Sequence, residues 1–300
     1  MTYPTNAPQP NYFGNSPVMR LLRLGLRASQ VVWPAMARRV SYRLFGTPLP
    51  MRWRRRRLRW HADWLVETWP FERAGLTVYR RASPTPGPVV LLLHGWGGHA
   101  GQLLALAHAL HEKGLQAVML DMPAHGRSLG GVSNLAQFAR AVDYAAARLR
   151  QQGHALHAVV AHSLGANAAA FAASRGLAVQ GLVLLAPPAS PHEYTRLFAR
   201  MFGLSEDTRA ALQGRLEARE GILMPQFEPA SVGPRIHVPT LVVHDRGDRV
   251  NPFANGQAYS RAIVGAELLA TEGVGHTKLL KDPGVLASVA AFAANLPSAA

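Results

Sequence analysis

A serine, an aspartate and a histidine stand in this chain where a nucleophilic triad would need them. Ser163 lies in Ala161-His162-Ser163-Leu164-Gly165, between an apolar stretch over 158–161 that predicts a strand and a small-residue stretch over 164–174 that predicts a helix. A serine at such a sharp turn presents its hydroxyl to solvent, and small neighbours allow close backbone approach. The positive end of the helix dipole then lies at a developing oxyanion. The alternative is that Ser163 merely caps the helix, because serine is a preferred N-cap residue.

The acid and the base follow later predicted strands. Asp248 lies in the turn beyond a strand predicted over 240–244, and we favour it over Asp245, which directly abuts that strand. Turn chemistry alone also explains both acids, because Asp is common in turns. His276 ends a glycine-rich loop that follows a short strand predicted over 268–270. From such a loop the imidazole can swing over the serine while the carboxylate fixes its tautomer.

A glycine-rich stretch, His94-Gly95-Trp96-Gly97-Gly98, follows a buried strand predicted over 89–93 and precedes a predicted helix. Backbone N–H groups in such a loop can approach a substrate oxygen, together with the N–H of the residue after the nucleophile. We therefore expect the backbone amides of Trp96 and Leu164 to form an oxyanion hole. The alternative is that the glycines form only a flexible turn.

The elements that must position these residues alternate regularly from about residue 76 onward. Short apolar stretches interleaved with helical patterns predict an α/β protein with a mostly parallel sheet covered by helices on both faces. The alternation lapses over 191–235, which contains helical stretches but no strand and therefore predicts an insertion over the sheet. The predicted strands are 76–79, 89–93, 117–120, 158–161, 182–185, 240–244 and 268–270.

These motifs resemble the α/β-hydrolase superfamily, and particularly its bacterial esterase-like or lipase-like serine hydrolases. The resemblance implies an α/β-hydrolase fold with an eight-stranded, mostly parallel sheet and a small helical cap over about 188–236. It implies no cofactor, and it favours the later acid of the Asp248 turn. Ala161 in place of a glycine and Asn251 after Val250 depart from the family pattern without removing a catalytic group. The matching stretches are residues 94–98, 121–128 (expected to be structural), 161–165, the Asp248 turn and Gly275-His276.

Basic charge is concentrated in an N-terminal extension. Residues 1–87 contain fifteen arginines and three acidic residues, so they carry +12 of the net charge of +15. We divide the chain into a basic, partly disordered and partly helical extension over residues 1–75 and a hydrolase domain over residues 76–300. A helical pattern covers 18–45 and is broken at Pro34, because proline removes a helix hydrogen bond.

Three interpretations of the extension stay open. In the first, which we favour, it is solvated or docks its apolar face on the hydrolase body. In the second, the Arg-studded helix over 18–33 attaches the protein to anionic lipid at the inner face of the membrane. In the third, the arginine-rich run over 52–59, with Trp53 and Trp60, binds nucleic acid, which we consider unlikely because charge runs are usually solvated.

The motifs predict a carboxylesterase or lipase-like enzyme that cleaves a small-molecule acyl ester through an acyl-enzyme. Ser163 would attack, His276 would carry the proton and Asp248 would orient His276. An acyltransferase or amidase on the same triad is an alternative, and so is a catalytically silent binding module. The chain has no cysteine and no metal-binding spacing, so we expect no metal and no cofactor. It has neither a signal-peptide pattern nor an apolar run of about 18 residues, which predicts a cytoplasmic protein.

Overall fold

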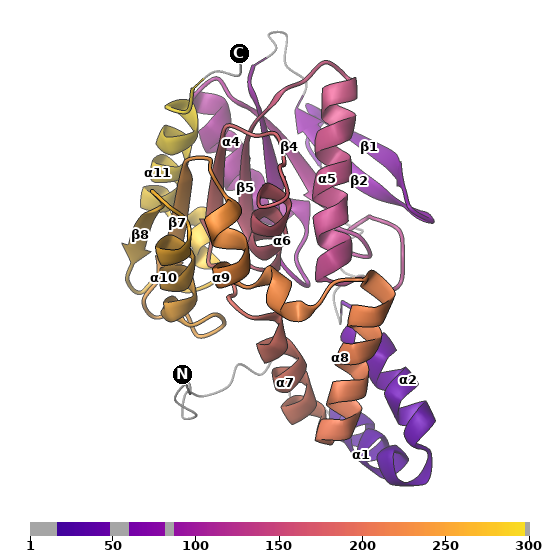
Figure 1. The fold of residues 1–300 in the computed structure, drawn as a ribbon. Helices are drawn as coiled ribbons and strands as arrows, with labels where there is room; N and C mark the ends of the chain where they lie inside the picture. The colour runs from indigo at the N-terminus through magenta and orange to yellow at the C-terminus, as the bar shows by residue number, and fades with distance from the viewer. Residues whose placement is uncertain (1–16, 49–59, 82–86, 298–300) are drawn as a thin grey trace.

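The computed structural model describes residues 17–48, 60–81 and 87–297, and a single sheet runs through its centre (Figure 1). The strand order is β1-β2-β4-β3-β5-β6-β7-β8. β2 is antiparallel to β1 and β4, and all other neighbours are parallel, so the prediction of an eight-stranded, mostly parallel sheet is confirmed. The strands are β1 (Trp64–Phe71), β2 (Ala74–Arg81), β3 (Val89–Leu93), β4 (Gln116–Asp121), β5 (Leu156–His162), β6 (Gly181–Leu185), β7 (Thr240–Asp245) and β8 (Glu267–Thr271).

The sheet begins earlier in the chain than the sequence predicted. β1 pairs with β2 along its whole length, from Trp64 opposite Arg81 to Phe71 opposite Ala74. The expected division at residue 76 therefore falls inside this hairpin, and part of the predicted extension belongs to the sheet. β1 is an edge strand, which explains how it accommodates Pro70, since a proline cannot donate to a ladder.

Helices cover both faces of the sheet, and each face has its own apolar core (Figure 1). The central strands β3, β5 and β6 are buried at every position, as parallel strands covered on both sides must be. One face is covered by α5 (Leu135–Gln151), α6 (Leu164–Ala173) and α10 (Phe253–Ala262). The other is covered by α4 (Leu104–Glu112), which follows the short helix η1 (Ala100–Leu103), and by α11 (Pro283–Ala294), which follows η4 (Lys278–Lys281).

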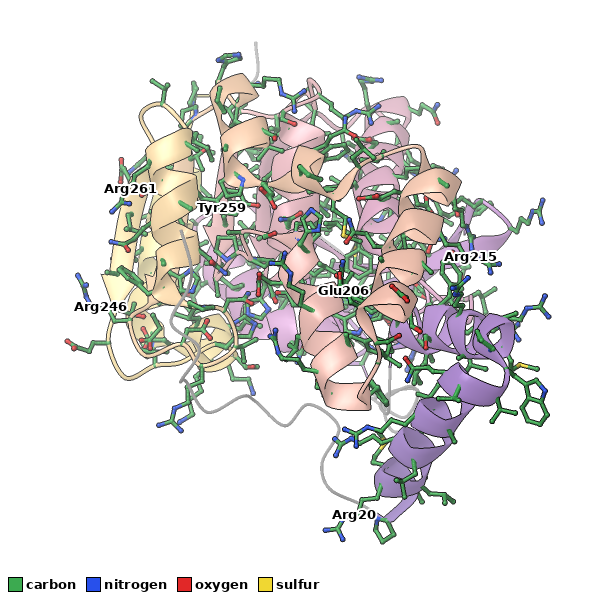
Figure 2. All side chains as sticks on the ribbon, turned by 60° about the horizontal axis from the view of Figure 1, so that its bottom comes forward. Arg20, Glu206, Arg215, Arg246, Tyr259 and Arg261 are labelled. Atoms are coloured by element: carbon green, nitrogen blue, oxygen red, sulfur yellow. The ribbon has the colours of Figure 1, made fainter. Side chains whose placement is uncertain are left out.

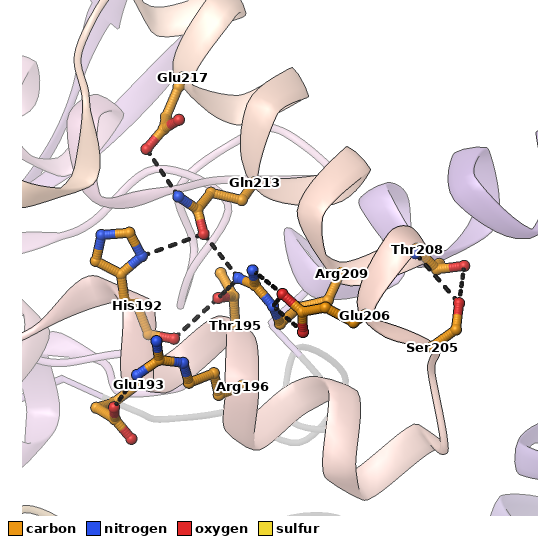
Figure 3. A network of polar contacts seen from close by, with 10 residues as sticks. All are labelled: His192, Glu193, Thr195, Arg196, Ser205, Glu206, Thr208, Arg209, Gln213 and Glu217. Carbon is orange, nitrogen blue, oxygen red and sulfur yellow. Dashed lines mark hydrogen bonds and ion pairs between the residues drawn. The ribbon is translucent and has the colours of Figure 1, made fainter. Parts of the chain in front are cut away.

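A helical insertion separates β6 from β7. Its two long helices, α7 (Pro191–Phe202) and α8 (Glu206–Glu220), are joined by a polar network (Figure 3). Arg209 of α8 donates to the Thr195 hydroxyl of α7 at 3.0 Å, and His192 Nδ1 of α7 lies 3.1 Å from the side-chain oxygen of Gln213 of α8. These bonds hold the two helices together as a cap. The insertion continues through η2 (Met224–Phe227), α9 (Pro229–Val232) and η3 (Gly233–Arg235).

The N-terminal helices pack on this cap. α1 (Pro17–Val32) and α2 (Pro34–Phe45) meet at Pro34, where the sequence predicted a break. α1 lies against α7 and α2 against α8, with Leu26 and Phe202 at the centre of a third apolar cluster. For residues 17–48 this is the docked arrangement that the sequence favoured. The arginine-rich run over 52–59 lies outside the described residues. None of the described helices is long and apolar enough to cross a membrane.

Candidate active site

Ser163 occupies a strained turn between β5 and α6. Its backbone has φ 53° and ψ −125°, in the positive-φ region that residues other than glycine rarely adopt. The neighbouring backbone is close: a Cβ at Gly95 would lie 2.6 Å from the Ser163 Cβ, and one at Gly165 would lie 2.5 Å from the carbonyl oxygen of His94. Although Ser163 stands at the N-cap position of α6, its side chain makes no capping hydrogen bond. Capping therefore does not account for this serine.

Asp248 and His276 form a hydrogen-bonded pair. His276 Nδ1 lies 2.7 Å from Asp248 Oδ2, while Asp248 Oδ1 accepts the backbone N–H groups of Val250 at 2.7 Å and Asn251 at 3.0 Å. Burial alone would raise the pKa of Asp248, but hydrogen bonds from the His244 and His276 side chains outweigh it and hold that pKa well below its usual value. Asp248 is therefore a carboxylate that can hold a proton on His276 Nδ1.

Asp245, the rival acid in the sequence, has a different set of partners. Its Oδ1 accepts the N–H of Gly247 at 2.9 Å, and its Oδ2 accepts the Thr271 hydroxyl and the Val274 N–H, both at 2.9 Å. These bonds join the end of β7 to the loop that precedes His276. The structure thus brings Asp248, and not Asp245, to the imidazole.

His94 orients the loop that carries Trp96. The N–H of Met122 donates to His94 Nε2 at 3.0 Å, so Nδ1 is the ring nitrogen that donates to the Gly95 carbonyl oxygen, at 2.7 Å. In a trans peptide the C=O and the next N–H point in opposite directions, so the Trp96 N–H points away from His94. Among the described residues, the N–H groups of Trp96 and Leu164 donate no hydrogen bond, which leaves both for a ligand. In the sequence, His94 stood out only as the first residue of the glycine-rich stretch.

His162 directly precedes Ser163 and contacts the loop that carries His276. Its Nε2 lies 3.1 Å from the carbonyl oxygen of His276, and the two rings lie 4.6 Å apart between centroids. Burial, together with the nearby charge of His276, lowers the pKa of His162 to about 3. His162 is therefore neutral near pH 7, and its Nε2–H holds the backbone of His276. Its place beside Ser163 was the only signal of this in the sequence.

A cavity of about 410 Å³ lies between the sheet and the cap, and Ser163, His276, Trp96 and Leu164 all line it. Helix α2 contributes to its wall, which sequence analysis did not foresee. In the described part of the chain no group of three His, Cys, Asp or Glu side chains is placed to hold a metal ion. The apolar lining includes Leu44, Phe45, Leu197, Phe198, Met201, Leu216, Ile222, Met224 and Phe227.

The sheet order, the serine at the turn after β5 and the helical cap after β6 define an α/β-hydrolase fold. Residues 84–222 match the model of the family described as serine aminopeptidase, S33. No protein of curated function is significantly similar to the chain in sequence.

Solved structures share the fold at low sequence identity. Est1E from Butyrivibrio proteoclasticus, solved with ferulic acid bound, is 20% identical over 76% of this chain and 96% of its own, with a TM-score of 0.60. A membrane phospholipase A, described as a bacterial virulence factor, is 20% identical over 92% of this chain and 96% of its own, with a TM-score of 0.59. The thioesterase domain from the curacin biosynthetic pathway is 20% identical over 77% and 99%, with a TM-score of 0.55.

Proposed function

We propose that this protein is a serine hydrolase that cleaves carboxylic esters with an apolar acyl group. The observation that carries the proposal is the Asp248–His276 hydrogen bond of 2.7 Å beside the cavity that Ser163 also lines. A nucleophile, a base and an orienting acid around one cavity are the parts that acyl transfer requires. The backbone N–H groups of Trp96 and Leu164, which donate to no described residue and lie on the same cavity, would stabilise the oxyanion of the transition state.

Each group has one role in this mechanism. Ser163 Oγ attacks the ester carbonyl carbon while His276 Nε2 accepts its proton, and Asp248 keeps the other ring proton on Nδ1. The N–H groups of Trp96 and Leu164 stabilise the tetrahedral oxyanion. Collapse expels the alcohol, which takes the proton from His276, and leaves an acyl group on Ser163. Water, deprotonated by His276, then attacks the acyl-enzyme and releases the acid.

The cavity lining favours an acyl group over a charged amine. Of its two described carboxylates, Glu220 is paired with Arg140 at 2.6 Å and accepts from Asn134 at 2.8 Å, while Glu217 accepts the N–H of Met224 at 3.0 Å through one of its oxygens. The remaining lining is mainly aliphatic and aromatic, as ligand pockets for apolar groups are. The neighbouring esterase, phospholipase and thioesterase structures support the same class of substrate. The match to serine aminopeptidases makes amide hydrolysis the second candidate.

The test is a panel of p-nitrophenyl esters from acetate to palmitate, run beside an aminoacyl p-nitroanilide and a fluorophosphonate probe. Ser163→Ala should abolish labelling and lower ester turnover by about 10⁴-fold or more. Ser133→Ala is the matched control, because Ser133 is another buried serine that lines the same cavity. Full labelling of Ser163→Ala would remove the proposed nucleophile, and turnover of the anilide alone would make amide hydrolysis the function.

A further inference from the structure

The outer face of α1 and the start of α2 are unusually apolar for a surface. Within the described residues, seven of the twelve large hydrophobic side chains that are exposed fall between residues 18 and 36. Val31 is 84% exposed, Val18 74% and Leu21 73%. Contiguous apolar patches on soluble surfaces generally mark an interaction site. The seven side chains are Val18, Leu21, Leu24, Val31, Val32, Trp33 and Met36, and we call them the outer apolar face.

Docking on the cap does not explain this face. The inner side of α1 already provides Leu26 to the third apolar cluster, with Met19 and Leu22 packed around it. A helix that only docks on a protein body is apolar on one side and polar on the other. α1 is apolar on both sides. The inner side of α1 is buried on the cap, so its outer side chains would have to be buried by an apolar partner that is not part of the described chain.

Positive charge surrounds the outer apolar face. Residues 17–48 contain six arginines and no acidic residue. Arg20, Arg38 and Arg39 are exposed, and among the described residues they form no ion pair. Figure 2 shows α1 and α2 projecting from the side of the cap, with Arg20 near the free end of α1. The projection leaves the face accessible to a large flat surface.

We propose that the outer apolar face docks this protein onto a bilayer that contains anionic phospholipid. The apolar side chains enter the acyl region while the arginines meet the phosphates, which is how interfacial amphipathic helices bind. Trp33 stands between α1 and α2 and suits the level of the headgroups. A second copy of the chain would bring two sets of six arginines together. Nucleic acid would bind the arginines but would leave Leu21 and Val31 without an apolar partner.

The docked orientation also has a consequence for the cavity. α2 ends in Leu44 and Phe45, which line the cavity that holds Ser163. Attachment through α1 and the start of α2 would place the cap next to the lipid surface. Lipid docking itself does not depend on the proposed hydrolysis, because it is measured as binding.

The experiment uses the full chain and sedimentation with vesicles of phosphatidylcholine, alone or mixed with phosphatidylglycerol. The paired substitution Leu21→Ser with Val31→Ser should weaken partitioning into the mixed vesicles by at least about tenfold. Leu65→Ser with Val264→Ser is the matched control, because these two side chains are 50% and 88% exposed on other parts of the surface. This control should bind as the unsubstituted chain does, and thermal melting should show that both variants are folded.

Charge is tested separately. Arg38→Gln and Arg39→Gln should each weaken binding to the mixed vesicles by about fivefold, and added salt should weaken binding of the unsubstituted chain. Equal binding to vesicles of phosphatidylcholine alone would overturn the anionic part of the proposal. Unchanged binding by the Leu21/Val31 variant, or an equal loss in the Leu65/Val264 variant, would overturn the docking face. A dimer that dissociates in the Leu21/Val31 variant, without vesicle binding, would overturn it in favour of a second copy.

Discussion

Replacing Asp248 and, separately, Asp245 by asparagine distinguishes two roles. One is orientation of the His276 imidazole, and the other is stabilisation of the loop that carries His276. In Asp248→Asn the amide oxygen stays with the N–H groups of Val250 and Asn251, so the amide NH₂ faces His276 Nδ1. The ring must then accept at Nδ1 and carry its proton on Nε2, where it cannot take a proton from Ser163. We expect kcat/KM to fall by about 10⁴-fold, which is about 5 kcal/mol of transition-state stabilisation.

Asp245→Asn provides the comparison, because both acids are buried and each accepts two backbone N–H groups and a side-chain donor at 2.7–3.0 Å. Whichever way the new amide turns, its NH₂ faces the N–H of Gly247 or of Val274. A buried donor left without an acceptor, plus a lost charge-assisted bond, should lower the free energy of unfolding by about 2–4 kcal/mol. The imidazole partner is unchanged, so kcat/KM should fall by less than about tenfold.

The assay is hydrolysis of a p-nitrophenyl ester, measured beside urea unfolding at the same temperature. The temperature is chosen so that both variants are folded, which keeps loss of structure out of the kinetics. If folded Asp245→Asn loses more activity than folded Asp248→Asn, the orienting acid has been assigned wrongly. Equal losses would mean that the two acids act through the loop and not through the imidazole tautomer.

Three further predictions follow from other contacts. His94→Gln should lower kcat about 10²-fold with little change in KM, because it loosens the peptide that carries the Trp96 N–H; steady-state kinetics would contradict this if only KM changed. Because the folded pKa of His162 is about 3 and its usual value is 6.5, the unfolded chain binds more protons between these values. As the pH falls from 6.5 towards 3, His162 should therefore lower the free energy of unfolding by about 1.4 kcal/mol for each pH unit in urea titrations, and His162→Gln should remove this pH dependence. Phe202→Ala should cost about 3–5 kcal/mol and expose α1 to protease, and unchanged melting would exclude cooperative docking.

Local patterns in the sequence were enough to locate most of the strands along the chain. The apolar stretches at β3, β5, β6 and β7 are buried on both faces, so their composition alone indicates strands. β1 escaped detection because only some of its positions are buried and because it contains Pro70, which is tolerated only at an edge. Whether a segment is an edge strand depends on its neighbours, which lie elsewhere in the chain.

In the candidate site, too, some residues could be found from the sequence and others only from the tertiary structure. Residue type and order along the chain determined Ser163, the glycines around it and His276, because the turn that presents a serine needs small neighbours within a few residues. Which of Asp245 and Asp248 hydrogen-bonds to His276 was decided by three-dimensional contacts, since both acids lie in one turn and only Asp248 reaches the imidazole. The N-terminal extension shows most clearly what the sequence by itself does not determine. Its arginines and leucines are visible in the sequence, but which leucines face the cap and which face outward was decided by the packing of α1 against α7, because a side chain's surroundings are set by residues distant in the chain.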